Sequence, residues 1–187
     1  MDAGLPRLEI VDGVLRQARW LASPNHDARP AGCSPELLVV HGISLPPGEF
    51  GGPWIDRLFT NELPAEAHPA FREIAALRVS SHVLIRRDGE LVQYVPFHLR
   101  AWHAGVSCWQ GRTRCNDFSI GIELEGTDTQ AYEPVQYRQL AAVVQALQRA
   151  YPAVGRHLPV GHSDIAPGRK TDPGPAFDWQ TLAALLA

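Results

Sequence analysis

The chain has 187 residues, a formal net charge of −3 and a pI near 6.2. This length predicts a single domain over residues 1–187 that buries most of its apolar surface without disulfides. Because no stretch gathers basic side chains, the composition argues against a nucleic-acid-binding protein. No segment is long and apolar enough to predict a membrane span, so we expect no membrane partner.

The three cysteines, Cys33, Cys108 and Cys115, are an odd number and form no C-x-x-C pair. They indicate neither a disulfide framework nor a thiolate zinc cluster, and they are typical of a reducing compartment. The first 20 residues mix charged and apolar side chains and contain no uninterrupted apolar run of the kind found in a secretion signal. We therefore expect a cytoplasmic protein.

The first strong element along the chain is a strand over about residues 37–42, which ends in Val39-Val40-His41 before Gly42. A long insertion over about residues 46–77 follows, with many prolines and glycines and short helical pieces over 54–59 and 70–77. Loops of this length inside a compact domain usually carry function. We expect the insertion to form a lid or a wall of the substrate site.

Residues 83–95 form two β-rich runs around Asp88-Gly89, the pattern most typical of a hairpin. Residues 118–126 alternate between apolar and polar side chains, which predicts a strand with two different faces. The apolar face would carry Phe118, Ile120, Ile122 and Leu124, and the polar face Ser119, Gly121, Glu123 and Glu125. Helical spacing over 134–151 predicts an amphipathic helix that covers the apolar face, and a last helix follows Asp178 as N-cap.

The loop over residues 161–175 offers His162, Lys170 and Asp172 on a backbone rich in glycine and proline. Far upstream, His41 closes a strand, where open α/β sheets place ligand sites. Alone, His41 could be a histidine satisfied by a backbone carbonyl, and Asp172 a turn carboxylate held extended by Pro173. Together, two imidazoles and a carboxylate are the ligand set of a catalytic zinc ion with one open position. We predict a Zn²⁺ site at His41, His162 and Asp172.

Three further residues are candidates for the chemistry. Glu123 on the polar face of its strand is costly to bury without a partner such as a metal or its water, so we expect Glu123 to be the catalytic base, with Glu125 facing solvent. Lys170 is either an ordinary exposed lysine or the cation that stabilises charge on the attacked carbonyl oxygen. His103, beside Trp102, is expected to line the substrate pocket or to support a ligand from behind.

A serine or cysteine nucleophile is the rival chemistry. The sequence contains no G-x-S-x-G motif, and neither Ser163 nor Cys108 has an adjacent base along the chain. We therefore favour the metal site.

Four segments in the same order carry a resemblance to a known family: residues 39–47, the hairpin at 85–89, the block over 114–126 and the loop over 161–175. From about Leu15 to Trp179 the chain resembles the cytosolic zinc amidases that act on 1,6-anhydro-N-acetylmuramyl-L-alanine, within the type 2 N-acetylmuramoyl-L-alanine amidases. The resemblance implies an α/β fold with a central mixed sheet flanked by helices and a zinc groove on one side, as in phage-lysozyme amidases and peptidoglycan recognition proteins. It implies His41, His162 and Asp172 as zinc ligands.

The same resemblance implies Glu123 and Lys170 as catalytic partners. The implied substrate is an anhydromuropeptide, cut between the lactyl group of its muramic acid and L-alanine during cytosolic recycling of the cell wall. By motif position, Arg78 and Arg114 would bind anionic parts of the stem peptide, since a guanidinium pairs bidentately with a carboxylate. The plainer alternative is two exposed surface arginines.

The chain departs from the family pattern at Gly42, where we expect an asparagine whose amide contacts the sugar side of the substrate. Phage-type amidases also carry a tyrosine directly before the histidine that begins the hairpin, which is His82 here, and a cysteine as third ligand. Here Ser81 and Asp172 occupy those places. This difference places the chain in the anhydromuropeptide branch and leaves Glu123 as the base.

Two other functions stay open on this sequence. One is a muropeptide sensor without catalysis on the same fold, against which the complete ligand set argues. The other is an envelope amidase that acts on polymeric peptidoglycan, against which the expected cytoplasmic location argues.

Overall fold

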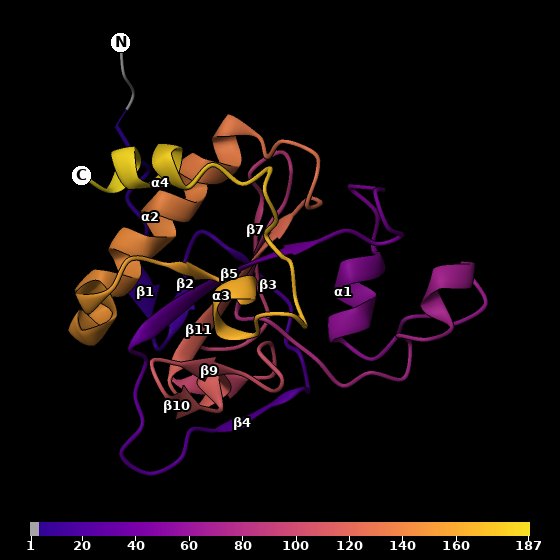
Figure 1. Cartoon of the computed structure of the whole chain (residues 1–187), viewed down its shortest axis with the longest axis horizontal. Helices are drawn as coiled ribbons and strands as arrows, with labels where there is room; N and C mark the ends of the chain where they lie inside the picture. Colours follow the sequence, from indigo (N-terminus) through magenta and orange to yellow (C-terminus); the bar gives the residue numbers. More distant parts are fainter. Residues whose placement is uncertain (1–3) are drawn as a thin grey trace.

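The structure is a computed structural model that describes residues 4–187. Its centre is a six-stranded mixed sheet with the strand order β12-β5-β11-β6-β7-β3. These strands are β3 (Arg19–Trp20), β5 (Leu37–Ile43), β6 (Val83–Ile85), β7 (Leu91–Gln93), β11 (Ser119–Glu125) and β12 (Val160–Gly161). Figure 1 shows β5 and β11 near the middle of the molecule. β11 runs parallel to β5 and β6, and β12 runs parallel to β5, whereas β6 and β7 are antiparallel. The α/β class and the hairpin are thereby confirmed.

The other strands form two-stranded ribbons outside this sheet. They are β1 (Ile10–Val11) with β2 (Val14–Leu15), β4 (His26–Ala28) with β8 (Leu99–Ala101), and β9 (Cys108–Trp109) with β10 (Arg112–Thr113). The helices are α1 (Trp54–Phe59), α2 (Pro134–Ala150), α3 (His162–Ile165) and α4 (Trp179–Leu186). Short 3₁₀ turns are η1 (Pro69–Phe71), η2 (Cys115–Asp117) and η3 (Pro152–Arg156).

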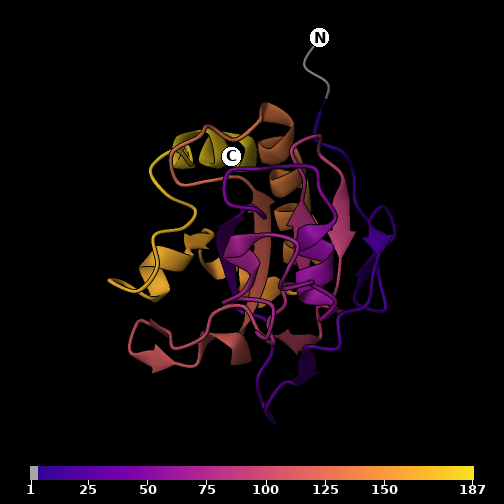
Figure 2. The ribbon, with the colours of Figure 1, turned by 90° about the vertical axis from the view of Figure 1, so that its right-hand side faces the viewer.

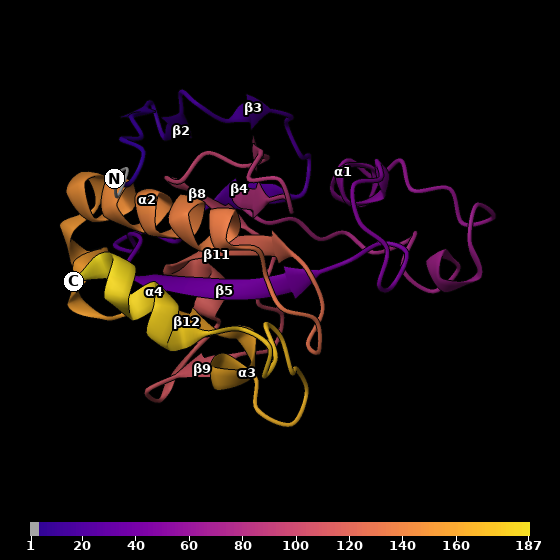
Figure 3. The same ribbon diagram turned by 90° about the horizontal axis from the view of Figure 1, so that it is seen from above.

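One face of the sheet packs against α2, and α4 packs on α2 (Figure 3). The core here combines apolar side chains of β5, β6 and β11 with the apolar stripe of α2, as the helical spacing predicts. α2 begins where the side chain of Gln136 accepts a hydrogen bond from the backbone N–H of Glu133, completing a capping box. Asp178 caps α4 by accepting from the N–H groups of Gln180 and Thr181, which confirms the predicted N-cap.

The opposite face of the sheet is covered by the insertion over 46–77 and by residues 99–118. In Figure 2, α1 lies in front of the sheet, on the side away from α2. Ile55, Leu58 and Phe59 of α1 are buried with Leu84 and Val92 of the hairpin. The insertion is therefore packed on the sheet through a hydrophobic core of its own, and it forms a wall of the domain.

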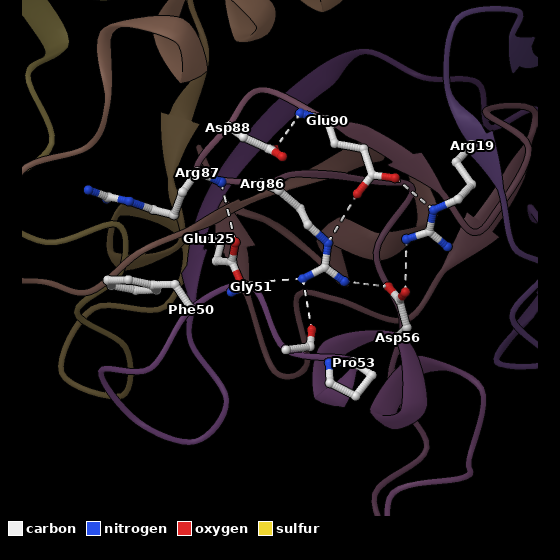
Figure 4. A pocket seen from close by; sticks show the side chains of 11 residues that line it. Arg19, Phe50, Gly51, Pro53, Asp56, Arg86, Arg87, Asp88, Glu90 and Glu125 are labelled. Carbon is white, nitrogen blue, oxygen red and sulfur yellow. Dashed lines mark hydrogen bonds and ion pairs between the residues drawn. The ribbon is translucent and has the colours of Figure 1, made fainter.

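A network of ion pairs also joins the insertion to the sheet around a cavity of about 540 Å³ (Figure 4). The guanidinium of Arg86 lies 3.1 Å from Asp56 in α1, 3.3 Å from Glu125 in β11 and 3.4 Å from Glu90. Arg19 contacts both Asp56 and Glu90. Glu125 also accepts hydrogen bonds from the backbone N–H groups of Gly51 and Arg87. Acidic and basic groups are thus paired with one another, which indicates a structural role.

The structure corrects three predictions of detail. Phe118 packs with Leu37 and Val39 on the opposite face from Ile120, because it ends the turn η2 before β11 begins. Glu125 is buried, with 1% of its surface exposed, since Arg86 pairs with it. The helical piece expected over 70–77 shortens to the 3₁₀ turn at Pro69–Phe71.

All three cysteines are free thiols, in agreement with the expectation of no disulfide framework. Between residues 4 and 187, no helix has the length and apolar character that crossing a membrane requires.

Candidate active site

Two parallel strands place His41 and Glu123 side by side. β5 and β11 pair over their whole length, and the register sets Glu123 opposite His41. Parallel strands in register present neighbouring side chains on the same face, and the alternation along β5 puts His41 on the face of Leu37 and Val39, away from α2. Both side chains are buried, with 2% and 8% of their surfaces exposed.

The next strand outward places the second histidine. β12 lies parallel to β5, and His162 is the first residue of α3 directly after it. The side chain of Asp164 accepts the N–H of Gly161 at 2.7 Å, and the N–H of Ser163 donates to the backbone oxygen of Asp172 at 3.0 Å. These bonds fold the loop back so that Asp172 lies against His162.

The three predicted ligands converge on one point. Nδ1 of His41 lies 2.9 Å from Nδ1 of His162, and Oδ2 of Asp172 lies 3.2 Å and 3.1 Å from these two atoms. A tetrahedral ion with bonds of ~2.0–2.2 Å would separate its ligands by about 3.4 Å. This group of histidine and carboxylate atoms is therefore compact enough to hold a metal ion.

The second nitrogen of each imidazole also has a partner. Nε2 of His41 lies 2.9 Å from Nδ1 of His103, and Nε2 of His162 lies 3.3 Å from the backbone oxygen of Ala104. Histidines that bind metals usually donate their other ring N–H to an acceptor in this way. The donor set and its surroundings therefore fit a zinc ion.

The protonation of the cluster suits the same role. Burial lowers the pKa of His41 to about 4, so its imidazole is neutral at pH 7 and keeps a lone pair for a metal. Burial alone would raise the pKa of Asp172, but hydrogen bonds with His162 and His41 outweigh it and hold the pKa of the carboxyl well below its usual range. Asp172 is thus an anion next to neutral imidazole.

A cavity of about 230 Å³ opens over the cluster. Its polar lining contains all three candidate ligands together with Glu123, His103, Ser80 and Lys170. Its apolar lining comes from Gly42, Ile43, Leu58, Phe59, Leu77, Val79 and Trp102. The insertion thus contributes Leu58, Phe59 and Leu77 to one wall of this cavity.

Glu123 is the unusual group in this cavity. Its Oε2 is buried and has no hydrogen-bond partner within the described part of the chain. Burial, and then repulsion from Asp172, raise the pKa of Glu123 well above its usual range, while Lys170 opposes this. A carboxyl group with a raised pKa is a stronger base than an exposed carboxylate, and an oxygen without a partner is available to accept a proton.

The two arginines predicted to bind substrate lie outside the cavity lining. Arg78 is exposed and contacts the backbone oxygens of Ala76 and Leu77. Arg114 is exposed over 68% of its side chain and pairs with Asp117 at 3.1 Å. His103, by contrast, lies in the cavity wall and touches His41.

Two further residues beside the site were given no role from the sequence alone, although both lie in the block over 114–126. Oδ1 of Asn116 accepts the N–H groups of both His103 and Ala104, at 3.1 Å and 2.8 Å. The hydroxyl of Ser119 lies 3.1 Å from Nε2 of His103. The polar face of β11, on which Ser119 shares a side with Glu123, is the signal that could have identified Ser119. Asn116 lies in the turn η2 before this strand, and no pattern in the sequence indicates its contacts.

Gly42 has a structural counterpart in Tyr132. A Cβ atom at Gly42 would lie 2.4 Å from the hydroxyl of Tyr132, which donates to the backbone oxygen of Pro173 at 3.0 Å. Tyr132 is 5% exposed, and its ring also lies against Gly126. The missing side chain at position 42 therefore makes room for a tyrosine next to the loop of Asp172.

Comparison with known proteins decides the family. The N-acetylmuramoyl-L-alanine amidase family matches residues 31–175. The chain belongs to this family. Over 178 residues, this amidase is 66% identical to the 1,6-anhydro-N-acetylmuramyl-L-alanine amidase AmpD of Escherichia coli K12, covering 95% of this chain and 97% of the relative. AmpD of Haemophilus influenzae is 48% identical over 172 residues, 92% of this chain and 94% of that protein.

Solved structures agree with this assignment. The crystal structure of a selenomethionine derivative of AmpD matches with a TM-score of 0.93 and 64% identity, covering 95% of this chain and 99% of that one. The amidase AmiD of E. coli, solved with the substrate anhydro-N-acetylmuramic acid-L-Ala-D-γ-Glu-L-Lys, matches with a TM-score of 0.58 and 30% identity, covering 95% and 65%. The resemblance drawn from the sequence is confirmed, and the chain is a hydrolase of the amidase type.

Proposed function

We propose that this amidase hydrolyses the amide bond between the lactyl group of anhydro-N-acetylmuramic acid and L-alanine in muropeptides, in cytosolic recycling of peptidoglycan. The observation that carries the proposal is the convergence of His41, His162 and Asp172 beside the unpartnered Oε2 of Glu123 in one cavity. The 66% identity to AmpD of E. coli over nearly the full chain supports the same substrate.

His41, His162 and Asp172 would hold one Zn²⁺. When bound, zinc supplies a Lewis acid that polarises the substrate carbonyl and makes water a stronger nucleophile near neutral pH. The neutral imidazoles and the anionic carboxylate would leave the site with a net charge of +1, which suits an attack that builds negative charge.

Glu123 is proposed as the proton carrier. Its raised pKa, its unpartnered Oε2 and its place in the cavity lining support a role in taking the proton of the attacking water and passing it to the nitrogen of the departing L-alanine. The atoms of the hydrolysis balance with this one proton transfer. The oxygen of the water binds the lactyl carbonyl carbon, the C–N bond breaks, and both protons of the water end on the products.

Lys170 and the two arginines are proposed to act on the substrate. Lys170 lines the cavity, so its ammonium can stabilise negative charge on the attacked carbonyl oxygen. Arg78 and Arg114 are exposed and carry guanidinium groups that can pair with carboxylates of the stem peptide. For Arg114 this pairing competes with its ion pair to Asp117.

The test is hydrolysis of purified anhydro-N-acetylmuramyl tripeptide, followed by mass spectrometry for free stem peptide. We expect release by the zinc-loaded protein, loss of release with a chelator and recovery after zinc is added back. Glu123→Gln should bind zinc normally and lower turnover by about 10²–10⁴-fold, because proton transfer is removed while the ligands stay.

Other outcomes identify the competing functions. Binding of the muropeptide without release of stem peptide would mean a sensor. Faster release from intact sacculi than from the soluble anhydromuropeptide would mean an envelope amidase. Near-normal turnover of Glu123→Gln would remove Glu123 from the mechanism while leaving the amidase assignment in place.

A further inference from the structure

We infer that His103 is a positioning residue that holds His41 in the tautomer and orientation needed to bind zinc through Nδ1. This inference rests on the proposed zinc site and concerns how the protein prepares it. It assigns His103, Ser119 and Gly121 to one support behind the proposed metal ligand, which favours the second of the two roles that the sequence left open for His103.

The first step is the geometry of His41. Its Nδ1 faces His162 and Asp172, so this nitrogen is the one that can bind a metal. Its proton must then sit on Nε2, which lies 2.9 Å from Nδ1 of His103. If His103 instead donated to Nε2 of His41, the remaining proton of His41 would occupy Nδ1 and block the metal. Metal binding therefore requires His103 to accept.

The second step is that His103 can accept in this direction. With Nδ1 as acceptor, the proton of a neutral His103 sits on Nε2, and Nε2 lies 3.1 Å from the hydroxyl of Ser119. A hydroxyl has lone pairs to accept that proton. The result is a chain of two donated hydrogen bonds, from His41 to His103 and from His103 to Ser119.

The third step is that several contacts hold the ring of His103 in place. The ring packs against Gly121 of β11, where an added Cβ atom would come within 2.4 Å of its Cγ. Its backbone N–H donates to Asn116, and the ring meets that of His41 edge-on with an interplanar angle of 87°. Only glycine at position 121 leaves room for the ring. This close approach explains why a glycine stands within a buried strand.

The arrangement also explains the polar face of β11. Ser119 receives the proton of His103, Gly121 accommodates its ring, and Glu123 lies next to His41 in the strand register. Three successive positions on one face thus serve the same site. Groups that orient metal-bound histidines usually change metal affinity by 10–100-fold when they are removed.

The experiment measures zinc binding without substrate. Zinc affinity is determined by competition with a chromophoric chelator for the wild type, His103→Leu, His103→Gln and Ser119→Ala. We expect about 10–100-fold weaker binding for His103→Leu. His103→Gln should recover much of this, because its amide oxygen can accept from His41, and Ser119→Ala should have the smaller effect. His98→Leu, at an exposed histidine, is the matched control and should bind as the wild type.

Nitrogen-15 NMR of the histidine rings supplies a readout that a general loss of packing would not mimic. In the zinc-loaded wild type, His41 should carry its proton on Nε2, and His103 should be neutral with its proton on Nε2. A charged His103, or a proton on its Nδ1, would overturn the inference even if His103→Leu failed to fold. So would wild-type zinc affinity in His103→Leu.

The outcomes separate this inference from the proposed function. A wild-type protein that binds zinc with the predicted tautomers but releases no stem peptide refutes the amidase proposal and leaves the role of His103 standing. If the zinc-loaded wild type releases stem peptide but zinc affinity is unchanged in His103→Leu, the role of His103 is refuted and the amidase proposal stands. A wild type that binds no zinc overturns both.

Discussion

Glycine at position 42 lets the hydroxyl of Tyr132 approach the end of β5 directly beside His41. The hydroxyl occupies the space that a side chain would need, and it donates to the backbone oxygen of Pro173, the residue after the candidate ligand Asp172. The ring of Tyr132 cannot easily retreat, because it is buried against Gly126 and Phe177. At the residue scale, positions 42 and 132 therefore form a pair that supports the loop of Asp172.

This pairing predicts an interaction that a double-mutant cycle can measure. Gly42→Ala should lower the free energy of unfolding by about 1–3 kcal/mol, because the new methyl group overpacks against the hydroxyl. In a Tyr132→Phe background the same change should cost much less, since the next atom of the ring lies 3.7 Å away. Urea unfolding of the wild type, the two single variants and the double variant gives the coupling free energy between positions 42 and 132. Additive effects would show that the two positions are independent.

At the scale of elements, α1 connects two features. Its Leu58 and Phe59 line the active-site cavity, and its Asp56 joins the ion-pair network around Arg86. The backbone oxygen of Phe59 also accepts hydrogen bonds from Ser23 and Asn25. The position of this cavity wall therefore also depends on contacts of α1 outside the cavity.

The network predicts a specific loss of stability. Arg86→Met should lower the free energy of unfolding by about 3–5 kcal/mol, because Glu125, with 2% of its side chain exposed, is left as a buried charge without its partner. Arg86→Met combined with Glu125→Met should cost less than Arg86→Met alone, since both charges are then removed. Urea unfolding checks both statements.

The control for this prediction is Arg72→Ala, an exposed arginine in the same insertion, which should change stability by no more than about 0.5 kcal/mol. If the free energy of unfolding falls as little for Arg86→Met as for the control, water must enter and solvate Glu125. The network would then not anchor α1.

At the scale of the whole molecule, the candidate ligands come from three separate segments. His41 lies in β5, His162 begins α3, and Asp172 lies in the loop that follows. A metal that binds all three would join the centre of the sheet to the C-terminal part of the chain. Such a metal binds the folded protein only, so it should raise the stability of the entire domain.

Thermal unfolding with and without zinc tests this consequence. Free zinc at about 100 times its dissociation constant should stabilise the fold by about 2.7 kcal/mol, or roughly 5–11 °C in Tm for a chain of this size. Asp172→Asn keeps the shape of the side chain but loses its charge, and its Tm should respond far less to zinc. Equal responses of the two proteins would exclude Asp172 as a ligand.

Much of the fold and of the site could be predicted because the signals are local. The alternation over 118–126, the helical spacing over 134–151 and Asp88-Gly89 each depend on neighbours along the chain, and β11, α2 and the hairpin follow them closely. The candidate ligands were accessible only in combination, because a single histidine or a carboxylate before proline also has ordinary structural uses. Their joint occurrence, together with the resemblance over four segments, indicated the metal site.

The remaining features depend on partners far away in the sequence, and only the tertiary structure decided them. The burial of Glu125 follows from Arg86, the reversed face of Phe118 from the turn that precedes its strand, and the room for Tyr132 from Gly42. Likewise, nothing near His41 in the sequence indicates that His103 lies against its ring. The sequence by itself determined the elements and the ligand types through short-range pattern and chemistry. Tertiary packing decided which side chains meet, because hydrogen bonds and ion pairs depend on distance in space, whatever the separation along the chain.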